Sequence, residues 1–373
     1  MRISDLREQR EQLEKVLIHW RDYKDEYERL SDWLQQIAIL TKNQKIALSA
    51  TLLEKAKQVE DVREILNKLE AGKQQIDKFN ESAKVLMKSP LDTYVNSQLQ
   101  TLNSRYQVEL NIAKDVLKKV ETNLDQHQEY LECLDKSQTW IADARELIRV
   151  CSEGTSSSTK ENLQNNLEQI QGLMHRREEG QNLIHATINL GEKVLRNTRS
   201  DGREAINNEI KELQAEWDRL VKKMSTAKVN LETNLLQWAD YDSSYNQLRQ
   251  WITDREAKLQ QVCEQKVVAK KGHTGLSSLP IGERKANLRE TNNIVQDIES
   301  FEPMIQSVTL KAEDLMQGAP ASEISSKYET LSKQAKELYA KQKETVEQHQ
   351  AFVDAGNTCF VRNSIPYCIV LNF

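Results

Sequence analysis

The sequence predicts an all-α fold built of tandem three-helix bundles, each a left-handed coiled coil, joined by continuous helical linkers into an elongated rod. Trp33, Trp140 and Trp251 recur at intervals of about 110 residues, each inside the same apolar pattern. Around each tryptophan, apolar residues lie three or four positions apart, which is the spacing of one helix face. The 373 residues include only five prolines and eleven glycines, while 29% are charged. Such a composition is typical of long exposed helices around narrow cores.

Charge and hydropathy exclude several classes of function. The net charge is −5, and acidic and basic residues are interspersed, so no basic stripe is available for a phosphate backbone and we expect no nucleic-acid partner. No apolar run approaches the ~20 residues of a membrane span, and the first residues lack the core of a signal peptide. The five cysteines form no CxxC pair, which indicates free thiols in a reducing compartment.

The first predicted repeat covers residues 20–126. Residues 1–19 are also helical in pattern, and we expect them to be the end of the last helix of an upstream repeat. Within the repeat, Thr51 and Glu54 have the spacing of a capping box at the start of the second helix. The first helix is expected to end near Thr41.

The boundary between the first two repeats contains no loop signal. No glycine or proline occurs from Leu91 to Glu153, and none occurs from Arg203 to Lys271. Because nothing interrupts either stretch, the last helix of one repeat is predicted to continue directly into the first helix of the next. Each stretch would then be a single helix of about 60 residues or more.

The second repeat is predicted to cover residues 127–237 and the third residues 238–353. Ser158 and Glu161 fit a capping box before the second helix of the second repeat. The third repeat has a longer first loop, so the register of its second helix is left open.

The last twenty residues, 354–373, follow neither the repeat nor a helical pattern. Gly356, Asn357 and Pro366 are expected to break any helix there. The segment is therefore predicted to be a disordered, non-repeat tail, and the alternative is a short peptide that binds a partner.

An early tryptophan and a later aromatic residue mark each repeat and are the predicted structural core: Trp33, Trp140, Trp251, Tyr106, Trp217 and Tyr328. This combination of period, aromatic positions and helical linkers resembles the spectrin repeat over residues 1–353. Helix sequences such as RLSDWLQQIAIL most resemble those of the giant nesprins, which are spectrin-repeat proteins of the nuclear envelope. Dystrophin-like and spectrin-like arrays remain as alternatives.

The resemblance implies a non-enzymatic scaffold rod, part of a cytoskeletal linker between the nuclear envelope and the actin cytoskeleton. It implies cytoskeletal or scaffold partners, with actin linked by family resemblance, and a location in the cytoplasm, at the cytoplasmic face of the nuclear envelope. We expect a monomer and leave self-association open, and we expect a fragment or short isoform of a longer array. The alternative is a regulatory adaptor that binds protein or lipid, although only short basic clusters such as Lys222–Lys223 would suit a lipid surface.

No catalytic, cofactor or metal site is predicted. His19, His127 and His349 occupy or adjoin seam positions that aromatic residues hold in the sister repeats, so they are expected to pack in the core. His175 and His185 lie ten positions apart on one predicted helix, which does not make them a ligand pair. Nothing in the sequence builds a catalytic pocket.

Overall fold

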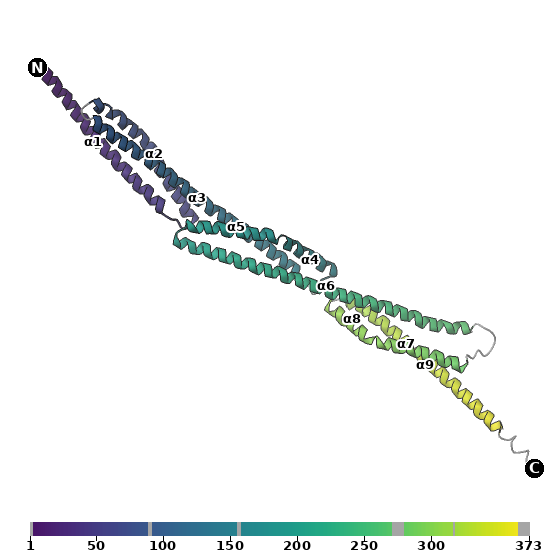
Figure 1. Ribbon diagram of the computed structural model, residues 1–373. Helices are drawn as coiled ribbons and strands as arrows, with labels where there is room; N and C mark the ends of the chain where they lie inside the picture. The colour runs from purple at the N-terminus through teal and green to yellow at the C-terminus, as the bar shows by residue number, and fades with distance from the viewer. Residues whose placement is uncertain (1–2, 89–91, 155–157, 271–279, 316–317, 365–373) are drawn as a thin grey trace, which may run out of the picture. The chain divides into compact units, whose positions relative to one another are not determined.

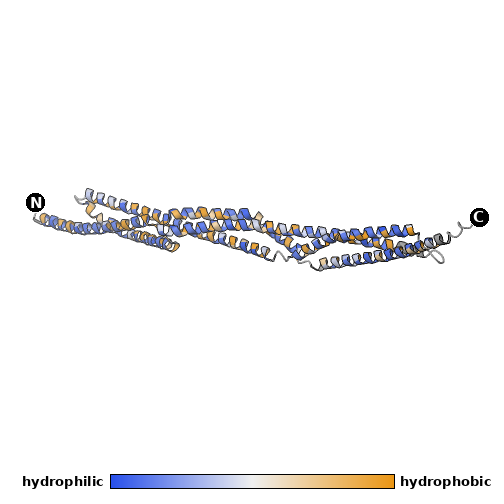
Figure 2. Ribbon diagram, turned by 90° about the horizontal axis from the view of Figure 1, so that it is seen from below, coloured by the Kyte–Doolittle hydropathy of each residue, from blue (hydrophilic) through white to orange (hydrophobic). Residues whose placement is uncertain are grey.

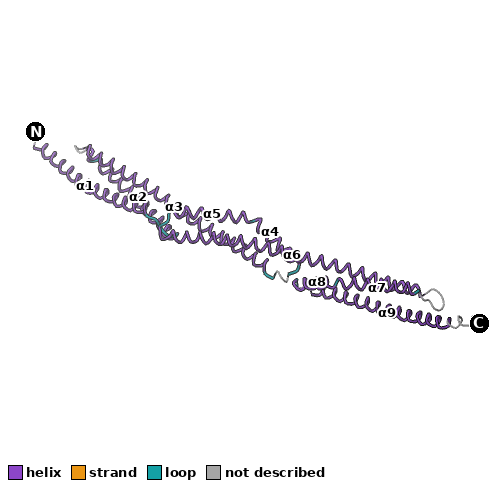
Figure 3. Tube along the Cα trace, turned by 60° about the horizontal axis from the view of Figure 1, so that its bottom comes forward, coloured by secondary structure: helices purple, strands orange, loops and turns teal. Residues whose placement is uncertain are grey.

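A computed structural model describes residues 3–88, 92–154, 158–270, 280–315 and 318–364, and it describes only the backbone of residues 3, 264–270, 318–319 and 360–364. Figures 1 and 3 show that this part of the chain is built from helices, and no strand is drawn in it. The elements in chain order are α1 (Ile3–Ile46), α2 (Leu52–Ala83), the short 3-10 helix η1 (Leu86–Lys88), α3 (Asp92–Ser152), α4 (Lys160–His175), α5 (Arg177–Arg196), α6 (Ser200–Lys270), α7 (Ile281–Ser300), α8 (Glu302–Asp314) and α9 (Gly318–Ser364). The prediction of an all-α fold is confirmed.

The two stretches without helix breakers are continuous helices, as predicted. Helix α3 has 61 residues and helix α6 has 71. Neither helix is interrupted where the predicted repeats join, because no proline removes a backbone donor and no glycine weakens the ladder there. In the described part of the chain, no helix combines the length and the apolar character needed to cross a membrane.

The chain divides into two compact units. The first contains residues 1–146 and 173–223, and the second contains residues 147–172 and 224–373. Helices α3, α4 and α6 each contribute residues to both units.

Helices α1, α2 and α3 of the first unit lie side by side around one apolar core (Figure 1). The core contains Leu34 from α1, Leu69 from α2 and Leu102 from α3, none of which is more than 1% exposed. Figure 2 shows hydrophobic and hydrophilic residues alternating along the helices, as expected when one stripe of each helix is buried. Buried Tyr106 also donates its hydroxyl hydrogen to the carbonyl oxygen of Leu69 at 3.0 Å.

The second unit repeats this arrangement with helices α6, α7, α8 and α9. Leu248 of α6, Val308 of α8 and Ala335 of α9 are fully buried. Tyr328 of α9 donates its hydroxyl hydrogen to the carbonyl oxygen of Ile298 at 3.0 Å. Tyr106 and Tyr328 therefore tie the third helix of a bundle to the backbone of the second in the same way.

The caps of α2 and α4 test the two predicted capping boxes. The hydroxyl of Thr51 accepts the backbone N–H of Glu54 at 3.2 Å, as predicted, although the Glu54 carboxylate accepts from Ala50 at 2.8 Å rather than from Thr51 itself. The prediction for Ser158 is wrong. Thr159 caps α4 by accepting the backbone N–H of Asn162 at 3.3 Å, because α4 begins directly after it.

Several predicted helix ends are also wrong. Helix α1 continues to Ile46 rather than ending near Thr41, and the second helix of the second predicted repeat is two helices that meet at Arg176. Helix α9 runs through Gly356 and Asn357 to Ser364. One glycine inside a helix costs only about 1 kcal/mol, which the helix-forming residues around it offset. The expected break at Pro366 lies outside the described residues.

Candidate functional site

Two loops of the first unit, each from a different predicted repeat, are joined through their backbones. One loop follows α1 and the other lies between α5 and α6. Ser49 and Thr198 form an isolated parallel β-bridge, and the backbone N–H of Arg199 donates to the carbonyl oxygen of Ser49 at 3.2 Å. The predicted repeats are therefore connected at a second place besides the continuous helix α3.

Gly202, in the first turn of α6, allows this close approach. A Cβ atom at Gly202 would lie 2.3 Å from the carbonyl oxygen of Ala50 and 2.8 Å from a methyl carbon of Thr198. The first distance is shorter than real Cβ contacts, and the oxygen belongs to backbone that cannot rotate away. Only glycine fits at this contact without displacing the loop.

Lys55 reaches from α2 into the contact. Its side chain is only 2% exposed, and its Nζ donates to the hydroxyl oxygen of Thr198 at 3.1 Å. Thr198 is fully buried and donates its own hydrogen to the carbonyl oxygen of Val194 at 2.6 Å. The Lys55 ammonium is thus bonded to a neutral hydroxyl, and burial lowers its pKa to about 8.

Gln58 holds the loop after α1 in its shape. Its side-chain amide donates to the carbonyl oxygens of Gln44 at 3.1 Å and Ala47 at 3.2 Å, and its oxygen accepts from the Ser49 hydroxyl at 2.9 Å. Backbone carbonyls that the end of α1 would leave unpaired are satisfied in this way. These hydrogen bonds therefore hold the loop after α1 in the shape that contacts Thr198.

His127 of α3 completes the contact. It is 5% exposed, as predicted for a core position, and its Nδ1 has no hydrogen-bond partner. Burial lowers the pKa of His127 to about 4, and the positive charge of Lys55 acts in the same direction. Its neighbour Tyr130 donates a hydroxyl hydrogen to Glu209 at 2.9 Å, which links α3 to α6. The prediction for His19 is wrong, since that residue is exposed in the N-terminal part of α1, where most side chains face solvent.

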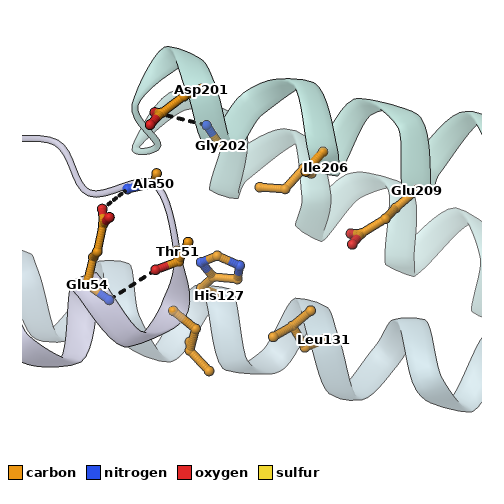
Figure 4. A pocket seen from close by; sticks show the side chains of 11 residues that line it. Ala50, Thr51, Glu54, His127, Leu131, Asp201, Gly202, Ile206 and Glu209 are labelled. Atoms are coloured by element: carbon orange, nitrogen blue, oxygen red, sulfur yellow. Dashed lines mark hydrogen bonds between the residues drawn. The ribbon is translucent and has the colours of Figure 1, made fainter.

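We call this cluster of Ser49, Lys55, His127 and Thr198 the first junction. A pocket of about 350 Å³ opens beside it (Figure 4). Its walls combine apolar side chains with three carboxylates: Leu52, Leu131, Ile206, Glu54, Asp201 and Glu209. The carboxylates already have partners, since Glu209 accepts from Tyr130 and Arg199 pairs with the other two at 2.8 and 3.4 Å. The Thr51 hydroxyl, which also lines the pocket, accepts the backbone N–H of Glu54, and the pocket lies where α2, α3 and α6 meet.

Of the predicted core residues, Trp33, Trp140 and Trp251 are half-buried, while Tyr106, Trp217 and Tyr328 are buried. Two of the tryptophans rest on glycines of the second helix. A Cβ atom at Gly72 would lie 2.2 Å from the Trp33 ring, and one at Gly180 would lie 2.7 Å from the Trp140 ring. Trp251 instead stacks on Phe301, with ring centroids 4.0 Å apart and an angle of 11° between the planes.

Metal-binding chemistry finds no support in the part of the chain that the structure describes. That part holds no group of three or more histidine, cysteine, aspartate or glutamate side chains placed to bind a metal ion. Four of the cysteines are described, and each is a free thiol. Cys133 accepts a hydrogen bond from Thr187 at 3.0 Å, within the bundle.

Long helices, shared apolar cores and interlocked loops define the class of protein as a helical-repeat bundle. No protein-family model matches the chain. Over 354 residues the chain is 65% identical to Muscle-specific protein 300 kDa of Drosophila melanogaster, a match that covers 95% of this chain and 3% of that protein. It is 22% identical over 307 residues to Microtubule-actin cross-linking factor 1 of Rattus norvegicus, covering 81% of this chain and 5% of that protein.

The mouse form of the same factor matches the same share of this chain. Isoforms 6/7 of Microtubule-actin cross-linking factor 1 from Mus musculus are 21% identical over 307 residues, which are 81% of this chain and 9% of that protein. The chain therefore spans less than a tenth of each of these relatives. It is similar, over most of its own length, to parts of much longer proteins, two of which are microtubule–actin cross-linking factors.

Proposed function

We propose that the chain is a non-enzymatic structural segment of a cytoskeletal scaffold. It comprises three spectrin-like repeats, at residues 20–126, 127–237 and 238–353, and residues 1–19 end an upstream helix. The observation that carries the proposal is the first junction, where Ser49 and Thr198 join two predicted repeats that α3 already connects. Two connections between neighbours allow tension and bending to pass from one to the next.

Neighbouring repeats are coupled in this proposal because helix formation is cooperative. A continuous helix couples its two halves because fraying on one side removes hydrogen bonds that support the other. The bonded loops add a second connection at a distance from the helix, so bending α3 also strains the contact between Ser49 and Thr198. In this proposal the function lies in length and coupling, and the six aromatic positions serve as structural anchors of the repeats.

The second part of the proposal concerns the location of the chain in the cell and its binding partner. The resemblance of the helices to nesprins supports a tether between the nuclear envelope and the actin cytoskeleton, located at the cytoplasmic face of that envelope. The similarity to the rat and mouse microtubule–actin cross-linking factors supports a cytoskeletal filament as the partner class. We propose an extended monomer that binds cytoskeletal or scaffold proteins.

Stretching single molecules of the full chain by their two ends tests the coupling. An unfolding repeat of about 110 residues releases roughly 360–400 Å of extended chain. If predicted repeats one and two are coupled, steps of about twice that length occur, and Gly202→Val divides them into single steps. Single-repeat steps only, in both the wild-type chain and the variant, would contradict the coupling.

Co-sedimentation of the full chain tests the partner class. Actin filaments, microtubules and vesicles of phosphatidylserine and phosphatidylcholine are compared at equal protein concentration. The proposal predicts pelleting with actin filaments and none with vesicles. Pelleting with vesicles alone would favour the lipid-binding adaptor, and pelleting with microtubules alone would replace actin as the partner.

A further inference from the structure

The junction between predicted repeats two and three can be aligned with the first junction residue by residue. Thr51 caps α2 and Thr159 caps α4 through the same hydrogen bond to the third residue on. Four residues beyond each cap stand Lys55 and Leu163, which are 2% and 1% exposed. The same buried position therefore holds a cation in one junction and an aliphatic side chain in the other.

Neighbouring positions confirm the alignment. The side-chain amide of Gln58 donates to the carbonyl oxygen of Gln44 at 3.1 Å, and that of Asn166 donates to the carbonyl oxygen of Cys151 at 3.2 Å. Each bond ties the second helix of a predicted repeat to the end of the first helix. The two loops are held by the same device, so the difference at Lys55 and Leu163 is not a shift of register.

The residue that the following repeat contributes to each junction also changes from a basic to an apolar side chain. His127 of α3 and Trp238 of α6 hold equivalent places in the repeat and are 5% and 8% exposed. Near Trp238, Lys160 of α4 donates to Asp242 of α6 at 2.6 Å, so α4 and α6 meet there inside the second unit. We call Lys160, Leu163, Trp238 and Asp242 the second junction.

Opening the two junctions has opposite consequences for solvation. Leu163 and Trp238 lose apolar burial when they enter water, which opposes opening. Lys55 regains full hydration of an ammonium group that was bonded to one neutral hydroxyl, and His127 gains partners for an unpaired nitrogen. The solvation of these side chains therefore favours opening at the first junction and resists it at the second.

The charged groups around Lys55 do not offset this difference. Glu54, the residue directly before Lys55, accepts the backbone N–H of Ala50 and pairs with Arg199. Glu209 of α6 accepts from Tyr130. On α3 the facing group is His127, which stays neutral above a pKa of about 4 and supplies no countercharge to Lys55.

We propose that the first junction is a built-in release point, which opens before the second junction because it buries Lys55 and His127 where the second buries Leu163 and Trp238. This inference deepens the proposed function and rests on its division into repeats. Under load or thermal fluctuation, predicted repeats one and two separate at their loops, while α3 keeps them connected. The connection between predicted repeats two and three then persists longest.

Hydrogen exchange of the full chain tests the order of opening, because two equivalent amides report on it. The backbone N–H of Lys55 donates to the carbonyl oxygen of Thr51, and that of Leu163 donates to that of Thr159, both at 3.0 Å. We expect peptides over residues 51–58 to exchange about tenfold faster than peptides over 159–166, after correction for intrinsic rates.

Exchanging the two side chains makes the test specific. Lys55→Leu should slow exchange over residues 51–58 about tenfold, and Leu163→Lys should speed it over 159–166 by a similar factor. Lys57→Leu is the matched control, because Lys57 is exposed on the same helix and should change neither region. Lys55→Met serves as a second variant if leucine disturbs the fold, which circular dichroism would show.

Equal exchange at the two junctions in the wild-type chain, or no response to Lys55→Leu and Lys55→Met, would overturn the proposal. Faster exchange at the second junction would do the same. These measurements use the free chain, so they are independent of whether it binds actin filaments. A negative result here with double-length unfolding steps retained would leave the scaffold function standing.

Discussion

Trp140 and Trp251 hold the same place in two predicted repeats but meet different partners. In the first unit, Trp140 lies against Gly180 of α5 and against Trp217, with 5.5 Å between the two ring centroids. In the second unit, Trp251 stacks on Phe301, which stands at the break between α7 and α8. A ring can thus be accommodated either by removing the opposing side chain or by supplying another ring.

The difference shows what the repeat signature specifies. The tryptophan and its period define where a large ring meets the second helix, and the opposing residue is free to vary if it leaves the space or fills it. Gly72 opposite Trp33 follows the first solution, with a Cβ position only 2.2 Å from the ring. The two solutions respond differently to mutation, because a glycine cannot move into a cavity and a phenylalanine can.

Removing the tryptophans should have the largest effect. We expect Trp140→Ala to lower the free energy of unfolding of its repeat by about 3 kcal/mol, at the lower end for large aromatic residues because the ring is half-buried. Trp251→Ala should cost less, about 2 kcal/mol, since Phe301 can rotate into the space. Urea denaturation of the full chain, followed by hydrogen exchange in each repeat, measures both. A larger loss for Trp251→Ala would show that Phe301 does not adapt.

Filling the space opposite Trp140 should have a smaller effect. Gly180→Ala places a methyl group 2.7 Å from the Trp140 ring, and such overpacking costs about 2 kcal/mol. Gly172→Ala is the control, because its Cβ position has no neighbour within 4 Å. Alanine is the better helix former, so Gly172→Ala should stabilise α4 by about 0.5–1 kcal/mol. Thermal melts that shift in the same direction for both variants would contradict the role assigned to Gly180.

The features predicted correctly from the sequence are those that repeat or extend along the chain. Helices α3 and α6 follow from the absence of breakers, and Thr51 is identifiable as a cap because it stands directly before its helix, with Glu54 three residues further on. The prediction for Ser158 fails because a run of hydroxyl residues precedes α4 and offers several possible caps. The predicted break at Gly356 fails because the local cost of one glycine is small against the helix on both sides.

The first junction was missed for a different reason. Ser49 and Thr198 lie far apart in the sequence, and no periodic pattern connects them. Lys55 carried a usable signal, because the equivalent residue of the next repeat is Leu163, a core type. A lone lysine on a helix is ordinarily exposed, however, so the substitution does not by itself indicate burial. The contact with Thr198 depends on two loops from different predicted repeats lying together, which no local pattern encodes.

The smallest expected effect concerns acid and the contrast between His127 and Trp238. The folded chain keeps His127 neutral down to a pKa of about 4, while the unfolded chain binds a proton near pH 6.5. Between these values the unfolded state holds more protons, so the stability that neutral His127 contributes at pH 7 is lost as the pH falls from about 6.5 towards 4.

His127→Phe removes this dependence of stability on pH. We expect the wild-type chain to lose about 1 kcal/mol more than the variant between pH 7 and pH 5.5, in the first unit only. Urea denaturation at pH 7 and pH 5.5, with hydrogen exchange locating the change, measures the difference between wild type and variant, so the carboxylates common to both cancel. Equal losses would mean that His127 is hydrated in the folded chain, and the first junction would then lack one of its two buried basic groups.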